Sequence, residues 1–207
     1  PSSLPPIYTG GLTPGRNYLV LSEDILRPAA IGFGTGCTSA GVLITTEIVK
    51  IKAQVASRPL SSSEIIKNIL RNRGVGGLFA GFDAQIMRDG PFYAVFFGSY
   101  ELHKFSIAKC FPGIKEEVNY FISGGLAGMT GWFVAMPFDV PKTILQSNPN
   151  ARVVGDFFPL MIKVARERGI AGGLYAGLLP TLVRAFPSNA ALFLGVESSR
   201  KLLDELM

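Results

Sequence analysis

The stretch Met136-Pro137-Phe138-Asp139-Val140-Pro141-Lys142-Thr143-Ile144-Leu145-Gln146 ends an apolar run with an acidic and a basic side chain. Asp139 and Lys142 stand one helical turn apart, so both lie on the same face of a helix. An ionised side chain at the centre of a bilayer costs roughly 2.5 to 3.5 kcal/mol. The pair is therefore expected to face a cavity, a partner helix or the membrane interface, and the alternative is a solvated helix end.

An earlier segment repeats this pattern 92 residues upstream. There the carboxylate, the ammonium group and the amide belong to Glu47, Lys50 and Gln54, and the amide of the later copy belongs to Gln146. Further special positions recur at an offset of 96, namely Arg88, Pro91, Phe97, Glu101 and Lys104 in the first copy and Arg184, Pro187, Phe193, Glu197 and Arg200 in the second. The chain therefore contains an internal repeat.

Composition favours a helical membrane protein. Of the 207 residues 48% are hydrophobic and only 17% are charged, and the mean hydropathy is positive. The net charge of +5 comes without a Lys/Arg-rich run, which favours anionic lipid over nucleic acid as a partner. Cys37 and Cys110 give no metal-ligand spacing or disulfide framework. No nucleotide loop or nucleophile constellation indicates an enzyme.

At these repeated residues the sequence resembles the mitochondrial carrier family. The family's repeat reads Pro-x-Asp/Glu-x-x-Lys/Arg on one helix, then a glycine-rich aromatic turn, then aromatic-Asp/Glu-x-x-Lys/Arg on the next helix. The resemblance covers about residues 30 to 204, and the two copies are similar to the second and third of the family's three repeats. It implies an all-α protein of the mitochondrial inner membrane, an incomplete carrier barrel of four transmembrane helices and two short amphipathic matrix-side helices.

The predicted organisation follows this repeat. An extended N-terminal arm covers residues 1–27, a second-like carrier repeat covers 28–110, and a third-like repeat covers 111–207. The membrane helices are predicted at about 28–52, 83–104, 117–146 and 178–203, and the surface helices at about 61–71 and 156–168.

Small residues and prolines predict how these helices pack and bend. Gly32 and Gly36 have the four-residue spacing that lets two membrane helices approach closely, and Gly124 and Gly128 repeat it. Thr45 stands where the family has its kinking proline, so the usual cause of a kink is missing there.

The resemblance implies two ion-pair networks that close in turn on the two sides of the membrane. The matrix-side network comprises Glu47, Lys50, Gln54, Asp139, Lys142 and Gln146, and the outer-side network comprises Glu101, Lys104, Glu197 and Arg200. Two repeats leave one junction for each network, which we expect to join Glu47 to Lys142 and Glu101 to Arg200. The other charged members would lack their natural partners, and they are Lys50, Asp139, Lys104 and Glu197.

Three further residues are substrate-binding candidates. Arg88 and Asp89 are adjacent inside a predicted membrane helix, which marks a functional site by default. The segment 184–197 is similar to ornithine and acylcarnitine carriers, in which an arginine matching Arg184 binds the substrate carboxylate. The resemblance therefore predicts Arg88 and Asp89 for charged substrate groups and Arg184 for a carboxylate.

The glycine-rich turns predict a bound lipid. In family members such turns hold cardiolipin phosphates, because helix N-termini present N–H groups and a positive dipole end to an anion. The corresponding glycines are Gly74, Gly81, Gly169 and Gly177. Arg73 and Arg168 replace the acidic residue that is common before the first glycine of each turn. The alternative is a helix–turn–helix connection without a ligand.

Two functions remain open at this point. Four spans form an arc that exposes polar groups to lipid unless other membrane-protein subunits cover them. The first prediction is therefore a degenerate carrier that serves as a structural accessory subunit of a larger respiratory-type complex. The alternative is an active exchanger for basic amino acids or acylcarnitines, with the first repeat absent from this sequence or supplied by another chain.

Overall fold

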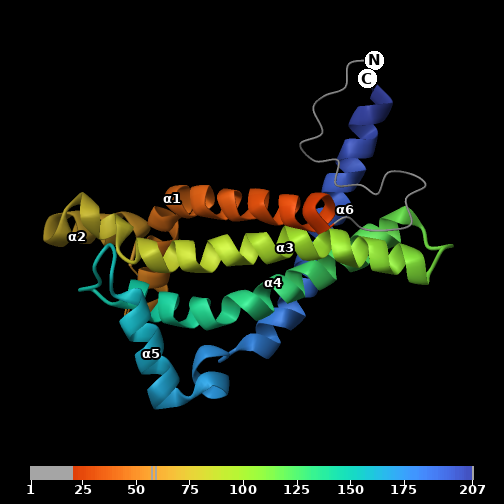
Figure 1. Ribbon diagram of the computed structural model, residues 1–207. Coiled ribbons are helices and arrows are strands. Elements are labelled where there is room, and N and C mark those ends of the chain that lie inside the picture. Colours follow the sequence, from red (N-terminus) through yellow and green to blue (C-terminus); the bar gives the residue numbers. More distant parts are fainter. Residues whose placement is uncertain (1–20, 57, 59, 207) are drawn as a thin grey trace. The chain divides into compact units, whose positions relative to one another are not determined.

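The structure is a computed structural model that describes residues 21–56, 58 and 60–206, with all of the regular elements helical. A short π-helix, η1 (Leu21–Leu26), leads into α1 (Arg27–Val55), which is followed by α2 (Ser62–Arg73), the 3-10 turn η2 (Val75–Phe79) and α3 (Phe82–Cys110). The same order then recurs as α4 (Glu116–Ser147), α5 (Phe157–Arg168), the π-helical turn η3 (Ile170–Leu174) and α6 (Leu178–Leu206) (Figure 1). The all-α prediction is confirmed.

The helices lie where the repeat predicts them, except at the boundary between the predicted N-terminal arm and the first long helix. Residues 1–20 of the predicted extended arm lie outside the described residues, and residues 21–26 are helical, so the arm prediction is wrong for this part. Glu23 and Asp24 lie in the first turn of η1, where the positive end of the helix dipole stabilises acidic side chains.

Two of the four long helices, among the described residues, are both long and apolar enough to cross a membrane by composition. They cover Glu23–Val55 and Glu116–Ser147. Helices α3 and α6 have 29 residues each, which exceeds the roughly 20 that a span requires. Helix α3 is less apolar because it contains charged residues, which include Arg88, Asp89, Glu101 and Lys104.

The chain divides into two compact units, each of which is described by itself. Unit 1 contains the described residues up to Phe33, Phe92–Val134 and those from Leu179 onward, and unit 2 contains Gly34–Pro91 and Ala135–Leu178. Helices α1, α3 and α4 contribute segments to both units.

Unit 1 has an aromatic core with glycines at its helix contacts. Phe193 of α6 stacks on Tyr100 of α3 with ring centroids 3.9 Å apart and lies 5.2 Å from Phe96. Gly124 of α4 faces the same ring, and a Cβ built there would lie 2.7 Å from Phe193. Gly128 likewise faces Asn189 of α6. The predicted close approach at these glycines is confirmed, since a larger residue would displace a side chain of α6.

Unit 2 contains an aliphatic core beneath the two short helices. In this unit α1, α3 and α4 lie side by side, with α2 and α5 at their ends (Figure 1). The buried residues of this core are Ile44, Ile48, Val49, Ile65, Ile69, Ala80, Ala84, Leu145, Ala151 and Phe157. Gly36 of α1 abuts the backbone of α3, because an added Cβ would lie 2.5 Å from the Asp89 carbonyl oxygen.

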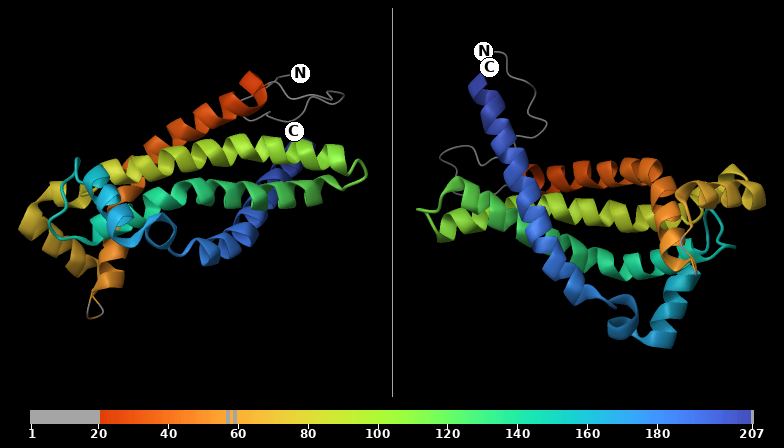
Figure 2. Two further views of the ribbon diagram at one scale, coloured as in Figure 1. Left: turned by 60° about the horizontal axis from the view of Figure 1, so that its bottom comes forward. Right: turned by 180° about the vertical axis from the view of Figure 1, so that it is seen from behind.

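Helix α1 bends within unit 2 although it lacks the family's proline. Figure 2 shows the change of direction towards the C-terminal part of the helix. Near the position of Thr45, the hydroxyl of Thr46 donates to the carbonyl of Leu43 at 2.7 Å. Such back-bonding of a threonine to the preceding turn bends helices, so it supplies a physical cause that the proline would otherwise provide.

The surface helices begin where the sequence predicts. The N–H of Ser61 donates to the Glu64 carboxylate at 3.0 Å, which is half of a capping box at the start of α2. Asp156 stands at the N-cap of α5. Each of the two helices ends at a glycine with a positive φ angle, 64° at Gly74 and 77° at Gly169. Glycine tolerates this conformation at low cost, so both repeats leave the surface helix in the same way.

Candidate functional site

The first part of the candidate site is an ion pair between the two repeats inside unit 2. Lys142 of α4 contacts the Glu47 carboxylate of α1, so the predicted Glu47–Lys142 pair is present. Lys142 is only 2% exposed. A charge this deeply buried requires a partner, because breaking a buried pair costs about 3 to 5 kcal/mol.

Arg88 of α3 contacts three carboxylates, one of which is the Glu47 carboxylate of this pair. Its guanidinium lies 2.7 Å from the carboxylate of Asp89, 3.3 Å from that of Glu47 and 3.5 Å from that of Asp139. Asp139, which is expected to lack its natural partner in a neighbouring repeat, is thus within reach of the arginine of α3 instead. Arg88 and Asp89, predicted as substrate residues, thus also belong to the ion-pair cluster of Glu47, Arg88, Asp89, Asp139 and Lys142.

A chain of buried amides extends this cluster. Gln146 of α4 donates to Gln85 of α3 at 3.1 Å, and Gln85 donates to the carboxylate of Asp89 at 2.7 Å. The Oε1 atom of Gln146 is buried and receives no hydrogen bond from the residues that the structure describes. Sequence analysis missed Gln85, although an amide four residues before an acidic residue inside a predicted span was an available signal.

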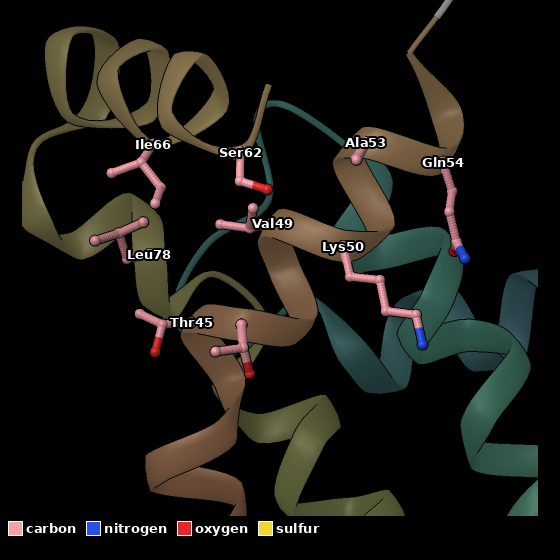
Figure 3. Close-up of a pocket in the computed structure, with 9 residues that line it drawn as sticks. Thr45, Val49, Lys50, Ala53, Gln54, Ser62, Ile66 and Leu78 are labelled. Carbon is pink, nitrogen blue, oxygen red and sulfur yellow. The ribbon is translucent and has the colours of Figure 1, made fainter. Parts of the chain in front are cut away.

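The remaining matrix-side candidates lie elsewhere on α1. Lys50 and Gln54 line an open groove of about 620 Å³ and point away from Ile66 and Leu78, which form its apolar wall (Figure 3). Among the ion pairs of the described residues Lys50 takes part in none, and the expectation that it has lost its natural partner stays a prediction.

Arg184, the third substrate candidate, belongs to unit 1, whereas Arg88 and Asp89 belong to unit 2. Its guanidinium carbon lies 5.7 Å from the centroid of the Trp132 ring. This cation–π contact holds the planar donor group against an aromatic face. Trp132 was missed by sequence analysis, and as the only tryptophan of the chain it was a visible candidate.

Of the four residues in the predicted outer-side network, the structure describes the side chains of Glu101 and Lys104. Lys104 pairs with Glu101 of its own helix at 3.2 Å and lies over the ring of Tyr100 at 5.3 Å. Lys104, which is expected to lack its natural partner in a neighbouring repeat, pairs instead with a residue one turn away on its own helix. The side chains of Glu197 and Arg200 lie outside the described residues, so the Glu101–Arg200 pair stays a prediction.

The glycines of the two glycine-rich turns have similar φ angles, but the backbone N–H groups of the two turns have different hydrogen-bond partners. Gly81 and Gly177 both have positive φ angles, 71° and 80°. The N–H groups of Gly81 and Phe82 donate to the carbonyls of Arg152 and Val153 at 2.8 and 2.9 Å, so protein occupies these donors at the α3 N-terminus. At the second turn the N–H of Leu178 donates to Tyr175 within the turn. Cardiolipin binding at the turns stays a prediction.

Comparison with known proteins identifies the family. The profile of the family described as "Mitochondrial carrier protein" matches residues 22–109 and 115–206. The chain belongs to the mitochondrial carrier family. Two copies of the carrier repeat therefore account for almost all of the described chain, and the carrier is a protein of the mitochondrial inner membrane.

Several similar proteins are named as mitochondrial carriers or transporters. The mitochondrial carnitine carrier of Saccharomyces cerevisiae is 36% identical over 195 residues, which are 91% of this chain and 57% of the relative. A mitochondrial arginine transporter of Arabidopsis thaliana is 34% identical over 87% of this chain and 62% of its own length. Mitochondrial ornithine transporter 1 of Rattus norvegicus is 33% identical over 86% and 62%.

These comparisons bear on the two functional predictions. The carrier chain spans about three fifths of the length of the curated relatives that it matches. The relatives are substrate transporters, which favours the alternative prediction of a solute exchanger over that of a structural accessory subunit.

Proposed function

We propose that this carrier exchanges solutes that combine a carboxylate with a cationic group, such as basic amino acids or carnitine esters. The observation that carries the proposal is the buried Arg88–Asp89 pair of α3, where Asp89 is only 3% exposed. Buried ion pairs are weak contributors to stability and can often be replaced by apolar residues. Their presence within a span is therefore better explained by recognition of charged solutes than by a scaffold role.

The substrate chemistry follows from the relatives and the charges. The names of three relatives specify carnitine, arginine and ornithine. Each of these solutes carries a carboxylate and a positive charge. In the proposed assignment Arg184 of unit 1 recognises carboxylates through its planar fork of donors, and the Arg88–Asp89 pair of unit 2 recognises charged groups of the solute.

The partners of the proposed transporter are a further carrier repeat and lipid. The apolar groove on α1 would pack against that repeat, whose carboxylate would pair with Lys50 (Figure 3). The repeat would be part of the same protein or of another chain. Cardiolipin would bind at the second glycine-rich turn, where Gly169 and Gly177 shape the backbone.

Exchange in liposomes tests the proposal. The protein is reconstituted with internal ornithine, and uptake of labelled ornithine, arginine and carnitine is compared with that of a neutral sugar. Arg184→Gln should lower uptake by about ten-fold or more, because loss of a charge-assisted bidentate contact costs more than 1.4 kcal/mol. Arg152→Gln is the matched control, since Arg152 is an exposed loop residue.

Two results would count against the proposal. Absence of saturable uptake by the unaltered protein, together with its co-migration in a large complex at fixed stoichiometry, would instead support the accessory-subunit prediction. Equal uptake by Arg184→Gln and Arg152→Gln would leave exchange standing but remove Arg184 from the site.

A further inference from the structure

A second cavity lies in unit 2, apart from the buried ion-pair cluster. It has a volume of about 520 Å³ and lies between the end of α1, helix α2 and the loop that joins α4 to α5. Figure 1 shows α2 beside this loop. The polar side chains that line the cavity are those of Lys52, Asn68, Asn72, Arg73 and Asn150. None of the described lining residues is acidic.

The cavity is lined by two cationic side chains, Lys52 of α1 and Arg73 of α2. Lys52 is half-buried, and it lines the same cavity as Arg73. Like charges in one cavity repel each other, more strongly where protein displaces water. The cavity is therefore set up to gain stability from an anion that neutralises both groups.

Arg73 is held in position by neutral acceptors. One Nη atom donates to the carbonyl of Pro149 at 2.9 Å and the other donates to the carbonyl of Ala151. Carbonyls fix the direction of the guanidinium without cancelling its charge. The positive charge is thus placed beforehand, so that an incoming anion does not have to order the side chain.

We propose that the cavity between α1, α2 and the α4–α5 loop binds a phosphate-bearing anion. A phosphate monoester carries a charge of about −1.5 to −2, which the two cations match. The amide groups of Asn68, Asn72 and Asn150 can supply further donors to its oxygens. The second repeat has no equivalent site, because Ile144 takes the place of Lys52.

The phosphate could come from solution or from a lipid headgroup, and binding assays separate these sources. The purified protein in neutral detergent is titrated with inorganic phosphate, with chloride at matched ionic strength as the reference, and thermal stability is recorded. In parallel, native mass spectrometry counts bound phosphatidic acid against phosphatidylcholine. Saturable binding of either phosphate source, above its reference, supports the proposal.

Two substitutions, one on α1 and one on α2, test whether Lys52 belongs to the proposed phosphate site. Lys52→Gln should weaken the binding of phosphate or phosphatidic acid by about ten-fold, which corresponds to 1.4 kcal/mol, and it leaves the Arg73 contacts in place. Arg71→Gln is the matched control, because Arg71 lies on the same helix α2 but lines a different cavity that contains Glu64. It should bind like the unaltered protein.

Clear outcomes would overturn the proposal. One is the absence of saturable binding from both phosphate sources. The other is an equal loss in Lys52→Gln and Arg71→Gln, which would indicate attraction to the overall basic surface instead of a site. Neither result depends on solute exchange, so the proposed transport function is tested separately.

Discussion

Lys50 and Lys142 occupy the same place in the two copies of the carrier motif, but their surroundings differ. Lys142 is buried and paired with Glu47, whereas Lys50 lines the open groove on α1. The motif determines which helix face carries the charge. The neighbouring helix determines whether that charge is paired and buried. Identical residue types in a repeat therefore predict position more securely than energetic role.

The packing glycines show the same contrast. Gly36 and Gly128 are separated by the motif spacing of 92 residues. Gly36 faces the backbone of α3 at Asp89 and Gly90, whereas Gly128 faces the side chain of Asn189. Backbone cannot move without shifting a helix, but a side chain can change rotamer. The first repeat should thus be less tolerant of added volume.

The largest predicted difference concerns the two lysines. Lys142→Met should reduce the free energy of unfolding by about 3 kcal/mol, the lower end of the range for a broken buried pair, because Arg88 stays near Glu47. Lys50→Met should change it by less than about 0.5 kcal/mol, as for an ordinary surface substitution. Chemical unfolding in mild detergent measures both. Similar losses in the two variants would show that Lys50 is also paired in the folded protein.

A smaller difference is expected for the glycines. Gly36→Ala should be less stable than Gly128→Ala by about 1 to 2 kcal/mol, because overpacking against backbone requires a helix to move. Both variants share the helix-propensity gain of alanine, about 1 kcal/mol, so their difference reports the contact alone. Thermal unfolding of the two proteins in the same detergent measures it. Greater loss in Gly128→Ala would mean that Asn189 cannot rotate away.

Much of the fold could be predicted from the repeat itself. Spacing located the surface helices, the glycine turns and the close approaches at Gly36 and Gly128, because each depends on local backbone or on small residues one turn apart. The Glu47–Lys142 pair was also predictable from the family motif. Its role in gating transport stays a prediction.

The side-chain environment of the site could not be predicted in the same way. The contacts of Arg88 depend on how α1, α3 and α4 bring three carboxylates within reach of one guanidinium. Gln85 and Trp132 contribute through partners that are far away in sequence. No periodicity encodes such meetings, since they arise from the packing of helices and from the rotamers that packing allows.

The smallest predicted effect distinguishes Arg73 from its equivalent Arg168, since Arg73 ties α2 to the α4–α5 loop. Arg73→Gln should cost about 1 kcal/mol for the lost hydrogen bonds, while the exposed Arg168→Gln should change stability by less than about 0.5 kcal/mol. Removal of Arg73 also relieves its repulsion of Lys52, which masks part of the loss. In a Lys52→Gln background that relief is absent, so Arg73→Gln should cost more there than in the unaltered protein. A double-mutant cycle of thermal unfolding measures this coupling, and additive losses would show that the two cations do not interact.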